Sequence, residues 1–317
     1  MTDEITAQSL TDRVRVACQA NPCAATIEVH FDGRRHDLRD VQIRGTVHGP
    51  SCLYARTLPA TIALRAGAFS PLHTAVSHLP DPCFWSAELP HLYQLQIELV
   101  RDGNVVARLN RTLGIRPVSV LGTNLYIAGR RQVLRGADVA DRFFPTDDPR
   151  RDVTALRRDA LVIVGDAFSP EFVEAADRVG LVLMIRMARR AASQFADVLP
   201  RMARSPSLLA VILETDDAVS PGIKAACGDV LLACEMTDAS QLPPAWADIC
   251  LAPADVLAKR ADKSGGRTIP TIALEGGAEL SLSAVRAACD KLQGELADRG
   301  DFAGYLVGCR PDRPPDA

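Results

Sequence analysis

Hydrophobic and polar residues follow two different patterns along this chain, and the change falls near residue 120. Before it, short segments such as 26–31 and 92–99 alternate apolar and polar side chains. This alternation is typical of strands with one buried face and one face in solvent. After it, short continuous apolar runs alternate with helical stretches, which is the pattern of a parallel sheet buried on both faces. The sequence therefore predicts two domains of different class.

The first predicted domain, residues 1–119, consists of short strands. The clearest candidates are 26–31, 41–45, 60–65, 92–99 and 105–112. Asp102-Gly103-Asn104 separates the last two, and this turn chemistry predicts an antiparallel hairpin. Many short strands with turns between them and little helix favour an immunoglobulin-like β-sandwich.

The stretch 125–138 joins the two predicted domains. It contains a strand, a turn at Gly129-Arg130 and a second strand that ends in Arg135-Gly136-Ala137-Asp138. We interpret it as the end of one domain and the first strand of the next.

The second predicted domain, residues 120–310, repeats strands and helices. The eight strand candidates are 133–137, 160–165, 180–185, 208–213, 229–233, 247–251, 269–274 and 303–308, and the helices between them include 148–158, 170–179, 190–203, 254–263 and 282–298. Eight such repeats predict a (β/α)8 TIM barrel. Because barrels of this kind usually need about 250 residues, this one must have short loops. The Pro-rich tail 311–317 is expected to be disordered.

Composition limits the classes of function. A net charge of -3 gives no basic field for nucleic acid, and no stretch is long and apolar enough to span a membrane. Because the start of the chain lacks the features of a signal peptide, we expect a cytoplasmic protein. All six histidines lie in the first domain and the nine cysteines lack paired spacing, so we expect no metal in the barrel. No nucleotide-binding motif occurs, and no cofactor is expected.

Several segments together resemble glycoside hydrolase family 2. They are the run FWSAELPHLYQL at 84–95, LGIRPV at 113–118, the stretch 129–136, and the barrel segments 169–184 and 205–209. The resemblance covers roughly residues 80–216, and more faintly the rest. It implies an immunoglobulin-like domain before a TIM barrel, and a retaining glycosidase with two carboxyl groups about 5–5.5 Å apart.

The resemblance also implies positions for these two carboxyl groups. The family's general acid is the Glu of an Asn-Glu pair at the end of the fourth barrel strand, where this chain has Thr215 and Asp216. The nucleophile is expected at the end of the seventh strand, where this chain has Glu275. One catalytic carboxylate is thus retained in the pattern, and the other is altered to a shorter side chain.

Other family positions differ more. The sugar-contacting residues after the first three barrel strands correspond to Asp138, Asp166 and Arg186 here, and the barrel has no histidine at all. We take Asp138, Asp166, Thr215 and Arg186 as candidate substrate-binding residues, with Tyr305 as a pocket aromatic.

Each candidate also has an ordinary structural interpretation. Asp216 is suited to cap the following helix, because a carboxylate there accepts backbone N–H bonds. Glu275 before two glycines is also a common way for a strand to end, Arg186 suits a solvated helix start, and Tyr305 suits core packing. Two hypotheses therefore stand: a retaining β-glycosidase, or a pseudo-glycosidase that binds carbohydrate or a protein partner as a scaffold.

Overall fold

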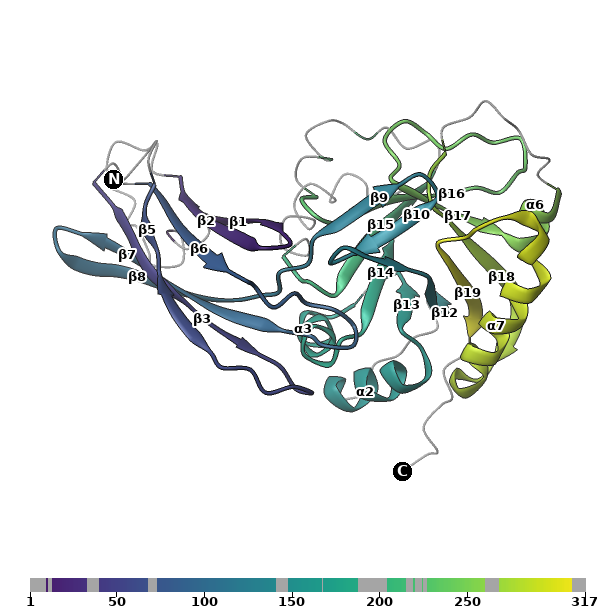
Figure 1. Cartoon of the computed structure of the whole chain (residues 1–317), viewed down its shortest axis with the longest axis horizontal. Helices are drawn as coiled ribbons and strands as arrows, with labels where there is room; N and C mark the ends of the chain where they lie inside the picture. The colour runs from purple at the N-terminus through teal and green to yellow at the C-terminus, as the bar shows by residue number, and fades with distance from the viewer. Residues whose placement is uncertain are drawn as a thin grey trace, which may run out of the picture. The chain divides into compact units, whose positions relative to one another are not determined.

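The computed structural model describes residues 10, 13–32, 40–67, 73–140, 148–166, 168–187, 204–214, 219, 224, 227–259 and 268–309. The chain forms two compact units (Figure 1). The first comprises Met1–Trp85 and Leu89–Pro117, and the second comprises Ser86–Glu88 and Val118–Ala317.

The first unit is a β-sandwich of two four-stranded sheets. One sheet has the order β1 (Val14–Asn21), β2 (Ala24–Phe31), β6 (Thr74–Pro80) and β5 (Arg65–Ala66), and the other has the order β4 (Ala60–Ala63), β3 (Gln42–Ser51), β7 (Leu92–Arg101) and β8 (Asn104–Leu113). Alternate residues of these strands, such as Ile27, Val29, Leu95 and Ile97, are buried in one hydrophobic core. The predicted sandwich is therefore confirmed, because strands with one apolar face are stable only when two such faces meet.

The hairpin predicted at Asp102-Gly103 is also confirmed. Arg101 pairs with Asn104 across the turn, and Asp102 and Gly103 have φ angles of 50° and 79°. Two positive φ angles give the turn a twist that matches the flanking strands. The sequence left open an irregular turn or an edge strand in residues 1–22, and β1 lies at the edge of its sheet. Strand β6 was not predicted, because its buried face includes the polar Ser77 and its other face the apolar Val76.

The second unit begins with a small antiparallel sheet of β9 (Val118–Leu121), β10 (Asn124–Ile127) and β11 (Arg130–Gln132). A tight turn at Ala128 and Gly129, with φ angles of 51° and 74°, joins the last two strands. The chain then enters the first barrel strand.

Eight parallel strands close the barrel in sequence order. They are β12 (Leu134–Ala140), β13 (Val162–Gly165), β14 (Val182–Arg186), β15 (Leu208–Glu214), β16 (Leu231–Glu235), β17 (Ile249–Pro253), β18 (Thr271–Leu280) and β19 (Gly304–Cys309). All eight predicted strands are confirmed, most of them shifted by one to two residues toward the C-terminus. Short apolar runs bounded by turn residues were sufficient to find them.

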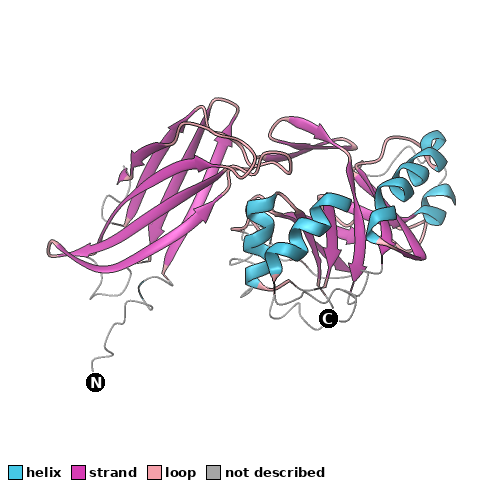
Figure 2. Ribbon diagram, turned by 90° about the horizontal axis from the view of Figure 1, so that it is seen from below, coloured by secondary structure: helices cyan, strands magenta, loops and turns pink. Residues whose placement is uncertain are grey.

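Helices lie outside the barrel strands (Figure 2). They are α2 (Pro149–Asp159), α3 (Pro170–Val179), α6 (Ala254–Lys259) and α7 (Val285–Glu295), with single 3-10 turns at Leu282–Ala284 and Ala297–Arg299. The predicted helix at 190–203, residues 260–263 of another and the tail 311–317 lie outside the described residues.

Local capping explains where two of these helices begin. The Asp148 carboxylate accepts hydrogen bonds from the backbone N–H groups of Arg150 and Arg151 and so caps the start of α2. Ser169 caps α3 in the same way through the N–H of Phe172, and Gly180 ends this helix with a φ of 83°. Side-chain oxygens at these positions satisfy donors that have no partner within the helix.

The barrel strands present alternate residues to the helices and to the barrel axis. Ile163, Leu183, Val211 and Leu232 form a cluster with the helix residue Phe172, so they face the helices. Neighbouring residues in register share a face of a sheet, whereas successive residues in one strand face opposite ways. The strand register therefore assigns every barrel position to the helix-facing side or to the axis side.

Candidate active site

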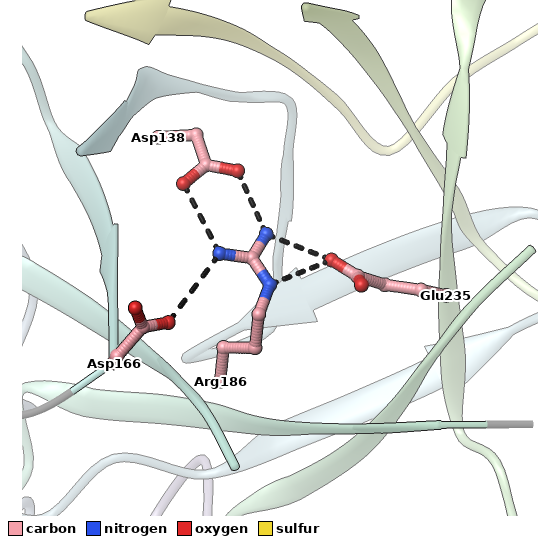
Figure 3. Close-up of polar contacts among 4 residues, drawn as sticks. All are labelled: Asp138, Asp166, Arg186 and Glu235. Carbon is pink, nitrogen blue, oxygen red and sulfur yellow. Dashed lines mark hydrogen bonds and ion pairs between the residues drawn. The ribbon is translucent and has the colours of Figure 1, made fainter. Parts of the chain in front are cut away.

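Four charged side chains meet where the barrel strands finish. They are Asp138 from β12, Asp166 directly after β13, Arg186 from β14 and Glu235 from β16, and we call them the Arg186 cluster (Figure 3). In barrels of this kind the carboxyl ends of the strands form the mouth at which ligands bind. The cluster therefore lies where a functional site is expected.

The guanidinium of Arg186 is the centre of the cluster. Its Nη1 and Nη2 donate to the two carboxylate oxygens of Asp138 at 3.2 and 2.7 Å. Its Nε and Nη2 donate to Oε1 of Glu235 at 3.0 and 2.7 Å. Asp166 Oδ1 lies 3.7 Å from Nη1 and completes the group. The planar fork of an arginine suits such two-point contacts with carboxylates.

The cluster is partly shielded from solvent. The side chains of Asp138, Arg186 and Glu235 are exposed by 21%, 24% and 31%, and that of Asp166 by 43%. Burial acts to lower the pKa of Arg186, but hydrogen bonds and charges from Asp138 and Glu235 outweigh it and raise this pKa above its ordinary value. Arg186 is therefore a permanent cation in this site.

The strand register explains why these residues converge. Arg186 is in register with Ile212, which in turn is in register with Ala233, so Arg186 shares the axis side with Ala233 and with Glu235 two residues further on. Asp138 reaches the same side through Val164 and Met184. Arg186 and Glu235 are the last residues of their strands, Asp138 is two residues before the end of β12, and Asp166 directly follows β13.

Glu235 was missed in the sequence analysis. The predicted fifth strand ended at residue 233, whereas β16 continues to Glu235. The sequence did contain a signal for Glu235. Residues two apart in a strand point to the same side, so a carboxylate two residues after Ala233 points the same way as Ala233. Glu214 at the end of β15 is in register with Glu235 and adds a further carboxylate on the axis side.

The structure places Glu275 on the other side of the sheet. Ala273 and Glu275 are in register with Tyr305 and Val307, and Ala273, Tyr305 and Val307 pack in the helix-facing core. Burial raises the pKa of the nearby Cys289 thiol on α7, and the negative charge of Glu275 makes a smaller contribution in the same direction. The nucleophile role predicted from the sequence requires a carboxylate on the axis side, and the register does not place Glu275 there.

The two residues expected at the general-acid position, Thr215 and Asp216, lie outside the described residues. The separation of the Asp216 and Glu275 carboxyl groups therefore does not enter the geometry described here.

Tyr305 lies far along its strand from the Arg186 cluster. It is the second residue of β19, and its ring packs edge-on against Phe302 at a centroid distance of 6.0 Å. Only 4% of it is exposed, and burial raises the pKa of its hydroxyl. The structure therefore brings together Asp138, Asp166 and Arg186 of the predicted substrate-binding residues, and it places Tyr305 in the helix-facing core.

The described residues include neither a candidate metal site nor a helix that could span a membrane. Among them, no group of three or more His, Cys, Asp or Glu side chains has an arrangement that could hold a metal ion. The helices in the described ranges include none with the length and hydropathy needed to cross a membrane.

Sequence comparison identifies the family that the first unit resembles. Residues 12–116 match the model of the glycosyl hydrolases family 2. A β-galactosidase of Oenococcus oeni is 29% identical over 117 residues, which cover 34% of this chain and 11% of that protein. A β-galactosidase of Alteromonas mediterranea is 28% identical over 114 residues, which cover 33% of this chain and 11% of that protein.

Solved structures match nearly the whole chain. A β-glucuronidase of Bifidobacterium dentium, complexed with coumarin-3-O-glucuronide, has a TM-score of 0.65 at 15% identity and covers 93% of this chain and 59% of its own. A Lactobacillus rhamnosus β-glucuronidase has a TM-score of 0.65 at 14% identity and covers 93% and 60%. The first unit is thus similar to glycosyl hydrolases family 2, and the whole chain shares the sandwich-and-barrel fold of these two solved chains, of which it spans about three fifths.

Proposed function

We propose that this protein is a glycosidase-like scaffold that binds carbohydrate at the mouth of its barrel without the retaining hydrolysis of active family members. The observation that carries the proposal is the Arg186 cluster, in which one guanidinium forms ion pairs with the carboxylates of both Asp138 and Glu235. A protein with similar sequence is named a β-galactosidase, and one with similar structure is named a β-glucuronidase. Carbohydrate is therefore the class of ligand to test first.

The chemistry of retaining hydrolysis supports the loss of catalysis. Such an enzyme needs one carboxylic acid that gives a proton to the leaving oxygen and one carboxylate that attacks the sugar. Asp138 and Glu235 both accept hydrogen bonds from a cation, so their oxygens serve as acceptors rather than as proton donors. Glu275, the expected nucleophile, is on the helix-facing side by register.

The same cluster supports binding. Glu235 and Asp166 each use one carboxylate oxygen toward Arg186, and each has a second oxygen that can accept a hydrogen bond. Sugar hydroxyls are donors of the matching kind. An arginine that fixes the carboxylates in place also reduces the entropy lost when a ligand binds.

The proposal is tested by pairing turnover with binding. 4-Nitrophenyl β-glycosides, including the galactoside, glucoside and glucuronide, are incubated with the protein, and a 2-fluoro glycoside is used to trap any covalent intermediate. Binding of methyl β-glycosides is measured by saturation-transfer NMR with the wild-type protein, Asp138→Ala and Glu235→Ala. Glu295→Gln is a matched control, because it removes a carboxylate that pairs only with Lys291 on the surface of α7.

We expect no turnover and no adduct, and we expect binding that Asp138→Ala and Glu235→Ala weaken and Glu295→Gln preserves. A covalent adduct on any carboxylate, or turnover lost in Glu275→Gln, would instead establish the retaining-glycosidase hypothesis. Absence of binding to every glycoside would overturn the carbohydrate-binding proposal.

A further inference from the structure

Every N–H direction of Arg186 is already directed at a carboxylate. A guanidinium has five N–H donors in a fixed plane. The Nε donor faces Glu235, the Nη2 donors face Glu235 and Asp138, and the Nη1 donors face Asp138 and Asp166 (Figure 3). Four of the five donors make hydrogen bonds, and the fifth, on Nη1, has only the Asp166 carboxylate beside it at 3.7 Å. A new anion would have to displace Asp138 or Glu235, or approach the fifth donor next to the negative charge of Asp166.

The cluster also carries an excess of negative charge. Three carboxylates surround one guanidinium, which leaves two negative charges uncompensated within the cluster. At these separations, in a site partly shielded from water, like charges repel more strongly than they would in bulk solvent.

Within their registered pairs, the ends of strands β17, β18 and β19 add no charged residue to the axis side of the mouth. The last axis-facing residues of β17, β18 and β19 within their registered pairs are Pro253, Leu274 and Gly308. None of the three carries a charge. The electrostatic preference of the described part of the mouth is therefore set by the Arg186 cluster.

We infer that Arg186 is a specificity-determining residue that, with most of its donors occupied by its own carboxylates, makes the barrel mouth select sugars by charge. Neutral sugars and amino sugars bring the hydroxyl and ammonium donors that the spare carboxylate oxygens accept. Uronic acids bring a carboxylate that finds at most one donor on Arg186, beside Asp166, and meets an excess of negative charge. This inference rests on the proposed carbohydrate-binding function and assigns its class of ligand.

The experiment compares three ligands that differ at one or two groups. The dissociation constants of methyl β-D-glucopyranoside, methyl β-D-glucosaminide and methyl β-D-glucuronide are measured by NMR titration at low and high salt. We expect the glucuronide to bind at least ~10-fold more weakly than the glucosaminide at low salt, and the difference to shrink as salt screens the charges.

A gain-of-binding variant tests Arg186 directly. Glu235→Gln removes one negative charge, while the amide oxygen can still accept from Nε and Nη2. We expect the affinity for the glucuronide to rise about 10-fold, because one source of repulsion is gone and Arg186 keeps its positive charge. Adding Arg186→Met to this variant should abolish the gain. Glu295→Gln, which removes the same charge from the surface of α7, should leave all three affinities unchanged.

The outcomes separate the inference from the function it rests on. If the glucuronide binds the wild-type protein as tightly as the glucosaminide, the charge selection is overturned while carbohydrate binding stands. If no ligand binds, the proposed function itself fails. If Glu235→Gln does not fold, Asp166→Asn replaces it, since Asp166 makes only the 3.7 Å contact; a glucuronide affinity that does not rise in that folded variant would overturn the inference.

Discussion

Arg186 and Asp138 form a two-point ion pair across the first and third strands of the barrel. Nη1 and Nη2 of the arginine lie 3.2 and 2.7 Å from Oδ1 and Oδ2 of the aspartate. The strands that carry them are separated by β13, so the pair ties two non-adjacent strands together at the mouth.

Removing Arg186 is expected to destabilise the barrel. Arg186→Met leaves Asp138 and Glu235 close together without their cation, and we expect a loss of roughly 1–3 kcal/mol in the free energy of unfolding for such a partly shielded group. Urea denaturation measures this loss. Replacing Arg178, whose partner Glu174 is on the exposed surface of α3, should cost less than about 0.5 kcal/mol and is the control. Equal losses in the two variants would mean that the cluster contributes no more than a surface pair.

Glu275→Gln is expected to leave ligand binding at the mouth unchanged within about twofold, since the register places this side chain toward the helices. The measurement is the NMR titration with the neutral glycoside, repeated on this variant and on Glu235→Ala. A loss of binding in Glu275→Gln similar to that in Glu235→Ala would show that Glu275 reaches the axis side.

Two glycines of the second unit are expected to respond in opposite ways to alanine. A Cβ on Gly136 in β12 would overlap the backbone carbonyl of Val162 in β13, so Gly136→Ala should destabilise by about 2–4 kcal/mol. Gly294 on α7 has no atom near the position of its Cβ, and Gly294→Ala should stabilise by about 0.5–1 kcal/mol through helix propensity. Thermal denaturation of both variants measures the effects, and a neutral Gly136→Ala would contradict the close strand contact.

Tyr93 is expected to make the stability of the protein depend on alkaline pH. Burial raises the pKa of this tyrosine to about 12, while its hydroxyl oxygen accepts a hydrogen bond from the Cys83 N–H at 2.8 Å. Because the folded state holds the proton more tightly than the unfolded state, this contribution is fully present below pH 10 and is lost as the pH rises from about 10 to 12. The loss should reach roughly 2 kcal/mol.

The test compares unfolding free energies of the wild-type protein and Tyr93→Phe between pH 9 and 12. We expect Tyr93→Phe to be less stable at pH 9, by about 1 kcal/mol for the lost hydrogen bond, and to show a shallower decline with pH. Parallel declines in the two proteins would mean that Tyr93 does not titrate in this range.

The sequence was sufficient to predict both architectures and the positions of all eight barrel strands. Alternating strands with one apolar face and little helix favour a sandwich, and short apolar runs between helices favour a parallel sheet. These patterns are local, and they are visible along a single segment such as 92–99 or 208–213. The predicted strand ends also placed Asp138, Asp166 and Arg186 directly after their strands.

Only the tertiary structure decided which of these residues meet. A strand buried on both faces is apolar at every position, so nothing in Thr271-Ile272-Ala273-Leu274 indicates which alternate residues face the axis. Closure of the barrel fixes that choice, because the register with β19 carries every second residue to one side. It directs Glu275 toward the helices, and it brings Glu235, which the sequence analysis missed, to the guanidinium of Arg186.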